Sequence, residues 1–505
     1  MNPSIYQVNI LQKAGKLSEA EALCKEILEI DIDKQYYIKY LLATIQVQRG
    51  NIIESIKNLE SAEDYFINDD NFHNTFGVVL LKAGNLQRAQ EYFKKAIKIN
   101  KVNIQAISNL ATACFKGGEL VNAERFFNDA ILLNSSDADI FYNYSQTLKS
   151  LGKINEAEIA ARKAVLLSPG NVEANINLVS FMTNKGNYKE AEKHYRNAIN
   201  IDSKSAELRH NLAMILLQSG EFVEGWKNYE WRWKTNDYKL AESFLDIPMW
   251  NGQLLDKKDT LLVWAEQGIG DQLLYSSMLH ELPSLVSNIV FACENRLVNI
   301  FSNTFHFLVV ISQSDLLKNK GMFSKINYQI PIASMGRFFR NNFDSFPGNS
   351  FLFFDDKLRE ELRTKYKLLY GKKPLIGISW KSTNPRYGKN KSLKPEEFAN
   401  VFKKVDATFI SMQYGTSSDD IEKCRELGLV INQDSTINAL NDLDLFSAQV
   451  SSMDLIITVS NSTAHFAGAL GIPCWTMISS GQGQFWYWFN DRRDSPWYSS
   501  LTLFR

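Results

Sequence analysis

Residues 84–117 read GNLQRAQEYFKKAIKINKVNIQAISNLATACFKG, and residues 118–151 read GELVNAERFFNDAILLNSSDADIFYNYSQTLKSL. Each stretch begins with a glycine and has an alanine five positions later and another twelve positions later. The glycine recurs every 34 residues in the first half of the chain, at Gly50, Gly84, Gly118, Gly152, Gly186 and Gly220. Gly15 with Ala20 indicates one earlier unit, so the first half is an array of repeats.

A 34-residue period with small residues at fixed positions is typical of tetratricopeptide repeats, which are pairs of antiparallel helices. We expect the glycine to turn the chain between the two helices, and the alanines to let neighbouring helices approach closely. Each helix pair leaves an apolar face that the next pair covers. The pattern therefore predicts an α-solenoid over residues 1–240, with its aromatic rings packed inside and a curved surface that binds proteins.

The array ends in an aromatic stretch, GEFVEGWKNYEWRWK, which runs from residue 220 to residue 234. Because the last face of a solenoid needs a cover, we expect Trp226, Tyr229, Trp231 and Trp233 to cap the array and attach it to a second domain. A cage that binds a ligand is the alternative interpretation. The composition changes at the same place, because all ten Trp lie from Trp226 onward and nine of the eleven Pro lie after residue 240.

The overall charge and the cysteines exclude several classes of protein. Lys+Arg and Asp+Glu number 56 each, and both halves are nearly balanced, which argues against a protein that binds nucleic acid or an anionic membrane. The five cysteines are far apart without a CxxC pair, so neither a disulfide framework nor a zinc knuckle is predicted. The chain has no signal-peptide pattern and no run of about 18 apolar residues, so we expect a cytoplasmic protein without a transmembrane segment.

Short apolar runs alternate with amphipathic stretches in the second half of the chain. We predict strands at 260–265, 288–293, 307–311, 328–332, 375–380, 408–413, 429–432, 455–459 and 474–478. This alternation indicates an α/β fold with parallel sheets in two Rossmann-like halves, residues 241–370 and 371–505. Ligands in such folds bind beyond the carboxyl ends of the strands, so we expect a site in the cleft between the halves.

The first candidate segment for this site is Gly268-Ile269-Gly270-Asp271, directly after a predicted strand. Two glycines permit a tight turn and a close approach of the backbone to a ligand, and Asp271 projects into the cleft at the start of a helix. The third glycine of a dinucleotide-binding fingerprint is missing. A plain helix-capping role for Asp271 is the alternative interpretation.

The second candidate segment is a basic loop that follows the predicted strand at residues 375–380. It holds Lys381, Arg386, Lys389 and Lys391. Clustered cations after a strand suit a phosphate group. A solvated basic loop without a ligand is the alternative, because lysines are usually exposed.

The third candidate segment, SNSTAHFAGALG at residues 460–471, follows the apolar run DLIITV. Hydroxyls and an amide at the start of a helix leave backbone N–H groups facing outward at the positive end of the dipole, which suits a pyrophosphate. His465 lies in the first turn, where it can contact a phosphate or a ribose. A packed structural histidine is the competing interpretation.

Four stretches together carry a resemblance to a known family. AEQGIGDQLLYSSML, GISWKS with KSLKPEEF, DLIITVSNSTAHFAGALGIPCW and the terminal RRDSPWYSSLTLFR resemble bacterial glycosyltransferases with an N-terminal tetratricopeptide array. The catalytic part is similar to the heptosyltransferase family of GT-B fold enzymes, including flagellin-modifying transferases. The resemblance implies inverting transfer of a sugar from a nucleotide-activated donor to a hydroxyl, without a metal or another cofactor. The acceptor it implies is a Ser or Thr of a protein bound by the array, such as flagellin.

The resemblance also implies roles for individual residues. Asp271 matches the candidate general base, and Lys391 matches the lysine that neutralises the donor phosphate, with Lys381 as a nearby alternative. Gly268 and Gly270 match the glycine loop. The diphosphate segment and the nucleotide pocket correspond to Ser462, Thr463, Ala464 and His465, and to Gln413 and Trp380.

Two features depart from the family pattern. Ser460 stands where many relatives have Asp, and the chain ends at Arg505, where relatives usually continue into a helix. Ser460 motivates a second hypothesis, a non-catalytic scaffold with a degenerate transferase domain. A third is a transferase for lipopolysaccharide or another glycan. Uridine-, guanosine- and cytidine-linked donors remain open.

Overall fold

The computed structural model describes residues 5–30, 35–134, 136–235, 244, 246–318, 321, 325–384, 388–415, 418–479 and 483–505. The chain forms two compact units, unit 1 (Met1–Phe181) and unit 2 (Met182–Arg505). Their boundary lies inside helix α11 (Val172–Asn184), well ahead of the domain boundary that the sequence places at residue 240. The cause is that the last helices of the array pack on the α/β elements that follow them.

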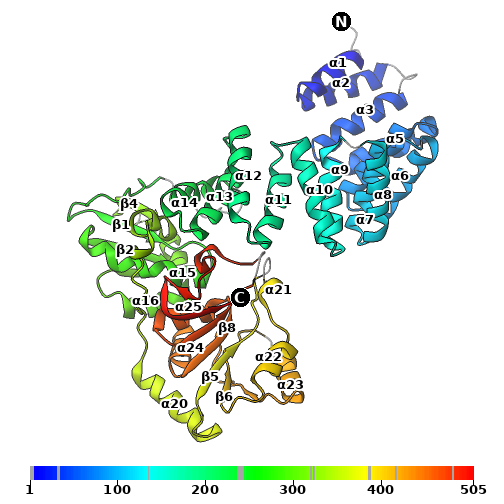
Figure 1. The fold of residues 1–505 in the computed structure, drawn as a ribbon. Helices are drawn as coiled ribbons and strands as arrows, with labels where there is room; N and C mark the ends of the chain where they lie inside the picture. The colour runs from blue at the N-terminus through cyan, green and yellow to red at the C-terminus, as the bar shows by residue number, and fades with distance from the viewer. Residues whose placement is uncertain are drawn as a thin grey trace. The chain divides into compact units, whose positions relative to one another are not determined.

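Unit 1 is a stack of helix pairs (Figure 1). Its helices before α11 are α1 (Ile5–Lys13), α2 (Leu17–Ile30), α3 (Gln35–Gln48), α4 (Ile52–Ala62), η2 (Glu63–Phe66), α5 (Asp70–Lys82), α6 (Leu86–Ile99), α7 (Ile104–Lys116), α8 (Leu120–Leu133), α9 (Ala138–Ser150) and α10 (Ile154–Leu167). The turn inside each pair holds a glycine with positive φ, as the spacing predicts: Gly15, Gly50, Gly84, Gly118 and Gly152. Glycine adopts this conformation readily because it has no Cβ.

The small residues of the repeats lie between helices, which confirms the sequence prediction. Ala89, Ala96 and Ala123 have no exposed surface. Phe93 and Phe127 are fully buried in the same apolar cluster, so rings and alanines alternate in the packing of neighbouring pairs. Burial of these faces against one another is the main source of stability in a solenoid.

Unit 2 begins with the last helices of the array. These are α12 (Tyr188–Ile201), α13 (Ala206–Gln218), α14 (Phe222–Tyr229) and η3 (Glu230–Lys234). The turn before α14 again holds a glycine with positive φ, Gly220. In η3 the ring of Trp231 lies beneath the guanidinium of Arg209, whose Cζ is 4.5 Å from the ring centroid.

Two tryptophans join these last helices to the α/β elements. The indole N–H of Trp226 donates to the carbonyl of Arg340 at 2.8 Å, and its ring meets Trp486 edge-on with centroids 5.2 Å apart. The ring of Trp233 packs on that of Trp264 at 5.3 Å. These are the contacts that the interpretation of a capping segment requires.

A buried ion pair ties η3 to the first sheet. The Arg232 side chain is fully buried, and its Nε and Nη2 donate to the two carboxylate oxygens of Glu266 at 2.8 and 2.7 Å. Glu230 accepts from Nη1 at 2.9 Å, and Ser334 accepts from Nη2 at 2.8 Å. Since Glu266 lies two residues after the end of β1, this network fixes the segment that leads into the glycine loop.

The first sheet has four parallel strands in the order β3-β2-β1-β4. They are β1 (Thr260–Trp264), β2 (Asn288–Cys293), β3 (Val309–Ser312) and β4 (Tyr328–Pro331). The helices between and after them are α15 (Ile269–Ser276), η5 (Ser277–Ser284), η6 (Asn295–Leu297), α16 (Val298–Thr304), α17 (Gln313–Lys318), η7 (Ile332–Met335), α19 (Gly336–Phe339) and η8 (Phe343–Ser345).

The second sheet has seven strands in the order β10-β11-β9-β8-β5-β6-β7. They are β5 (Leu375–Ser379), β6 (Thr408–Ser411), β7 (Ile431–Asn432), β8 (Leu455–Val459), β9 (Cys474–Met477), β10 (Asp494–Ser495) and β11 (Tyr498–Phe504), and only the β10–β11 pair is antiparallel. The helices are α20 (Asp356–Tyr370), α21 (Gly388–Lys391), α22 (Pro395–Phe402), α23 (Ser418–Glu426), α24 (Leu443–Ser451), α25 (Ser462–Leu470) and η9 (Trp486–Trp488). This order is that of a doubly wound sheet.

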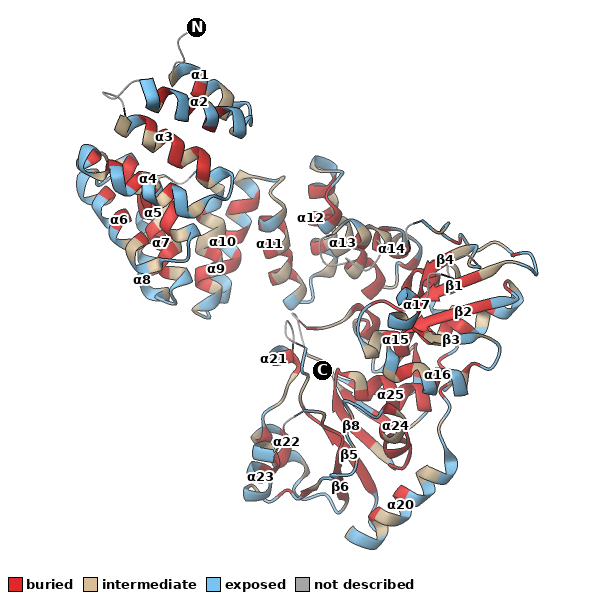
Figure 2. Ribbon diagram, turned by 180° about the vertical axis from the view of Figure 1, so that it is seen from behind, coloured by how far each residue is buried: buried red, intermediate tan, exposed pale blue. Residues whose placement is uncertain are grey.

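Helices cover both faces of the second sheet. Ile376 and Ile378 of β5 point to one face, into a cluster with Phe398 of α22 and Ile421 of α23. The other face carries α24 and α25 (Figure 1). The strands are accordingly buried along most of their length (Figure 2), as expected for parallel sheets.

All nine predicted strands are present, and the runs at 288–293 and 455–459 match β2 and β8 without an offset. Strands β10 and β11 lie outside the prediction. All five cysteines are free thiols in buried positions. Within the described ranges, no helix has the length and apolar character needed to cross a membrane.

Candidate functional site

The site begins where the winding of the second sheet reverses, at the adjacent strands β5 and β8. Asn461, just after β8, donates from Nδ2 to the hydroxyl of Ser379 at 2.9 Å and to the carbonyl of Lys381 at 3.2 Å. These bonds tie together the loops that leave the two carboxyl ends. Such a switch point is where doubly wound sheets bind ligands.

The start of α25 forms one wall of the site. Asn461 caps this helix by accepting the N–H of Thr463 on Oδ1 at 3.0 Å. Ser462 is half-buried, whereas Thr463, Ala464 and His465 are buried. The partly exposed Ser462 therefore marks the point where the positive end of the helix dipole reaches the surface.

His465 is held by aromatic neighbours. Its Nδ1 lies 3.2 Å from the Tyr498 hydroxyl, and its ring stacks on Trp488 with centroids 5.2 Å apart. Burial, with a contribution from nearby Lys391, lowers the pKa of His465 to about 3. The ring is therefore neutral at neutral pH and adds no positive charge to the site.

The free edge of the His465 ring faces α15, the helix that follows β1. A Cβ on Gly270 would lie 2.8 Å from Cδ2 and 3.3 Å from Nε2 of His465, so only glycine permits this approach. The starts of α15 and α25 therefore meet beyond the carboxyl ends of the two sheets. The glycine loop predicted from the sequence makes this contact through Gly270.

Asp271 lies at this meeting point, in the first turn of α15. Its carboxylate accepts the N–H of Gly268 at 3.3 Å, so it does cap the helix. Burial raises the pKa of Asp271 to about 6, although the Gly268 bond and the charge of Lys391 act to lower it. The capping role thus coexists with a carboxyl group that titrates close to neutral pH.

Lys391 lies in α21, and its charge acts on the pKa of Asp271. Only 6% of the residue is exposed. Its Nζ donates to the carbonyl of Ser460 at 3.4 Å and lies 3.5 Å from the ring centroid of Phe485. Burial lowers the pKa of Lys391 to about 8, and the charge of Asp271 acts against this shift. The site thus pairs a partly desolvated anion with a desolvated cation.

The other residues predicted for the donor side lie after the carboxyl ends of β5 and β6. The ammonium of Lys381 forms an ion pair with Asp420, whose carboxylate also accepts the Trp380 indole N–H at 2.9 Å. Gln413 accepts the backbone N–H groups of Trp380 and Lys381 at 3.1 and 2.9 Å. Trp380 is fully buried in the core.

The remaining predicted positions differ in their surroundings. Ser460 is buried, and its hydroxyl accepts the indole N–H of Trp488 at 2.8 Å. Lys389 is exposed, while Arg386 lies outside the described residues. Among the residues that are described, no group of three or more His, Cys, Asp or Glu is placed to hold a metal ion.

Sequence reasoning missed the aromatic residues of the C-terminal segment as site components. Phe485, Tyr487, Trp488 and Tyr498 surround His465 or Lys391. The available signal was the dense aromatic run QFWYWF at residues 484–489. The role of this run depends on which helix it packs against, and that helix cannot be identified without knowing the order of the strands in the sheet.

Comparisons with known proteins identify the repeats. The tetratricopeptide repeat family matches residues 80–146, 138–171 and 172–205. Among curated proteins, Protein FlbA of Caulobacter vibrioides is 26% identical over 298 residues, which cover 54% of this chain. The chain matches 48% of FlbA, about half the length of that relative.

Solved structures match part of the chain. MamA from Desulfovibrio magneticus RS-1 is 19% identical, with a TM-score of 0.31 over 34% of this chain and 97% of that chain. PilF of Pseudomonas aeruginosa is 13% identical, with a TM-score of 0.36 over 41% of this chain and 95% of that chain. The protein therefore contains tetratricopeptide repeats, followed by an α/β region with mostly parallel sheets.

Proposed function

We propose that unit 2 transfers a sugar from a nucleotide-activated donor to a hydroxyl, with inversion and without a bound metal. The observation that carries the proposal is the pairing of Asp271 with Lys391 where the starts of α15 and α25 meet. A base and a cation placed in this way suit a reaction in which one atom loses a proton while another gains negative charge.

Asp271 acts as the general base in this proposal. The acceptor oxygen forms a bond to the anomeric carbon of the sugar, and its proton passes to the Asp271 carboxylate. A pKa of about 6 keeps the carboxyl ionised at neutral pH and makes it a stronger base than an ordinary aspartate. Its partial burial also limits competition from water.

Lys391 and the start of α25 act on the leaving group. The bond between the anomeric carbon and the donor phosphate oxygen breaks, and the nucleoside diphosphate leaves with additional negative charge. The Lys391 ammonium, with a pKa of about 8, is mostly charged at pH 7 and stabilises this charge. The positive end of the α25 dipole and the Ser462 hydroxyl support the same phosphate.

The acceptor follows from the repeats. Tetratricopeptide arrays bind other proteins on their curved surfaces. We therefore infer that the hydroxyl belongs to a Ser or Thr of a protein captured by the array, flagellin or another surface protein. An acceptor protein retained by the full chain, and modified by it, supports this substrate class over a glycan.

The test uses the purified full chain with UDP-, GDP- and CDP-linked sugars. We expect one nucleotide to raise the thermal midpoint and the matching donor to be turned over. Asp271→Asn should reduce turnover by about 10²–10⁴-fold while nucleotide binding persists, because general base catalysis contributes on that order. Asp356→Asn is the matched control, since Asp356 lies in the exposed first turn of α20.

Two outcomes contradict the proposal. Turnover that is unchanged in Asp271→Asn would remove the general base from it. Nucleotide binding without turnover of any donor would favour a non-catalytic scaffold, which the engagement of the Ser460 hydroxyl by Trp488 makes the second candidate.

A further inference from the structure

A cavity of unit 2 lies apart from Asp271 and Lys391. It measures about 660 Å³ and is lined by η5, by the segment between α19 and α20, and by the turn between β10 and β11. No residue of the candidate transferase site lines it. The cavity therefore needs an explanation of its own.

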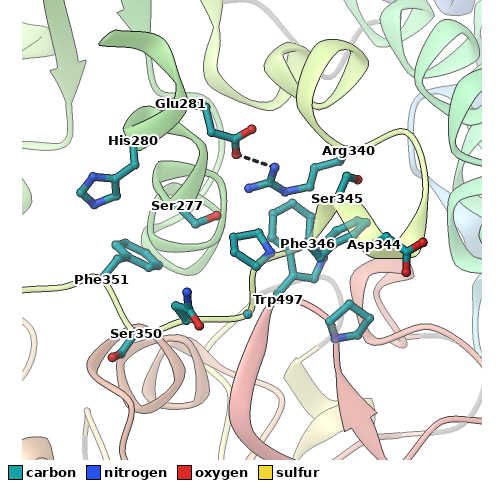
Figure 3. Close-up of a pocket in the computed structure, with 14 residues that line it drawn as sticks. Ser277, His280, Glu281, Arg340, Asp344, Ser345, Phe346, Ser350, Phe351 and Trp497 are labelled. Carbon is teal, nitrogen blue, oxygen red and sulfur yellow. Dashed lines mark hydrogen bonds and ion pairs between the residues drawn. The ribbon is translucent and has the colours of Figure 1, made fainter. Parts of the chain in front are cut away.

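A buried arginine forms part of the cavity wall. Only 1% of Arg340 is exposed, and its Nη1 donates to Glu281 at 2.5 Å and to the carbonyl of Phe339 at 2.7 Å. Nε and Nη2 of Arg340 are buried without a hydrogen-bond partner among the described residues. Figure 3 shows the guanidinium reaching over the cavity towards Glu281 and Ser277.

The two unpartnered nitrogens define a ligand geometry. Nε–H and Nη2–H lie on one edge of the planar guanidinium, where they form a fork that matches two oxygens of one carboxylate or phosphate. A buried donor without a partner costs about 1–3 kcal/mol, and more when it is charged. A ligand that accepts both bonds removes this penalty.

Aromatic residues surround the fork. The Cζ atom of Arg340 lies 5.5 Å from the Phe346 ring centroid and 5.7 Å from that of Trp497. The Trp497 Nε1–H is also buried without a partner among the described residues, and Phe351 lines the same cavity. The site thus offers three donors beside apolar walls, the combination that holds a ring bearing an acidic group.

The charges around the cavity disfavour a ligand with more than one negative charge. Arg340 already shares its charge with Glu281, and Asp344 adds an exposed negative charge at the rim. Burial lowers the pKa of His280, so that ring is neutral at neutral pH. Because little positive charge is left uncompensated, a phosphate dianion is disfavoured relative to a carboxylate.

We propose that this cavity is a binding site for a small ring-bearing monocarboxylate, whose two oxygens accept from Nε and Nη2 of Arg340 while the ring packs on Phe346 and Trp497. The site is independent of the proposed sugar transfer. The Trp497 ring on the cavity wall also meets the ring of Tyr275 of α15 edge-on, with centroids 5.9 Å apart.

Ligand-observed NMR on the full chain tests the proposal with three probes, benzoate, phenylacetate and glucuronate. We expect saturable binding of at least one probe at millimolar concentration. Benzamide and inorganic phosphate should bind at least about tenfold more weakly than the best carboxylate, because a charge-assisted bidentate contact is worth more than 1.4 kcal/mol. No saturable binding of any of the three carboxylates would overturn the proposal, as would equal binding of benzamide.

Variants separate the fork from the cavity. Arg340→Lys keeps the charge but lacks the fork, and should weaken binding at least about tenfold. Trp497→Phe keeps a ring and removes one donor, and should weaken it less. Arg425→Met, at an exposed arginine of α23, is the control and should leave binding unchanged. Circular dichroism checks that each variant is folded, and wild-type binding by folded Arg340→Lys and Trp497→Phe would overturn the proposal.

Discussion

Gly118 in unit 1 and Gly336 in unit 2 are both glycines, but for opposite reasons. Gly118 has a φ of +78° and open space where a Cβ would stand. Gly336 has ordinary helical φ, but a Cβ there would lie 2.3 Å from Cζ2 of Trp226. The first glycine is required by the backbone and repeats with the array. The second is required by Trp226, which lies 110 residues earlier in the chain, and no local sequence pattern predicts it.

Charged pairs show the same contrast. Arg88 and Glu60 of unit 1 form an ion pair at 2.9 Å, with 40% and 46% of their side chains exposed. Arg232 and Glu266 of unit 2 form a pair at 2.7 Å with almost no exposed surface. The exposed pair of the array is one of many similar contacts, and each contributes little to stability. The buried pair of the α/β unit is a single contact that no neighbouring pair can replace. Substitutions of matched chemistry should therefore have unequal effects in the two units.

The largest difference is expected at these ion pairs. Arg232→Met leaves the buried Glu266 carboxylate without its cation, and should lower the free energy of unfolding of unit 2 by about 3–5 kcal/mol. Arg88→Met should lower that of unit 1 by less than about 1 kcal/mol. Urea unfolding followed by Trp fluorescence reports on unit 2 alone, because all ten Trp lie at or after Trp226.

Far-UV circular dichroism completes this measurement, because it also reports on the helices of unit 1. A similar loss of stability in the two variants would break the comparison. It would mean that Arg232 gains as little from its buried partners as an exposed arginine does.

A second difference concerns the sign of the pH dependence. The pKa of Asp271 in the folded state is about 6, above the value of 3.8 for an ordinary aspartate, so the folded state binds more protons between these values. Stability of unit 2 should therefore fall as pH rises from about 4 to 6, by about 2 kcal/mol relative to Asp271→Asn. Urea titrations of both proteins at several pH values, followed by Trp fluorescence, measure this difference.

Glu21 of unit 1 provides the contrasting case. Bonds from Lys25 and Arg49, opposed by burial, lower its pKa below the ordinary value of 4.5. Its contribution to the stability of unit 1 is present above that value and is lost as pH falls through the lowered pKa.

A difference in unfolding free energy between wild type and Asp271→Asn that stays constant from pH 4 to 7 would contradict the assignment of a raised pKa to Asp271.

The same contrast explains what the sequence predicts well. The glycine period gives the helix pairs, because each repeat is stabilised by its sequence neighbours. Strands β2 and β8 are predictable because they are mostly apolar runs that are buried after their first residue. Strand β11 is missed because its buried residues Tyr498, Leu501 and Leu503 are interrupted by polar ones at the end of the chain.

The candidate site is predictable only in part. Asp271 and Lys391 each follow a predicted strand, so the topology places each of them beyond the carboxyl end of its own sheet. The burial of Trp380 is different, because it depends on which face of β5 the α22 and α23 helices cover. Likewise, the free edge of Arg340 results from contacts among η5, η8 and the β10–β11 turn, which no sequence window contains.

The smallest expected difference returns to the two glycines. Gly336→Ala places a methyl group against Trp226 and should lower the stability of unit 2 by about 1–3 kcal/mol, as overpacking does. Gly118→Ala meets no neighbour but holds alanine in the left-handed region, which should cost unit 1 about 1 kcal/mol.

A double variant separates the two mechanisms. Trp226→Phe should reduce the effect of Gly336→Ala, since the smaller ring leaves room for the methyl group. No second substitution should relieve the cost of Gly118→Ala in this way, because that cost comes from the backbone conformation and not from a neighbouring side chain. Additive effects of Trp226→Phe and Gly336→Ala, measured by urea unfolding, would contradict the steric explanation for Gly336.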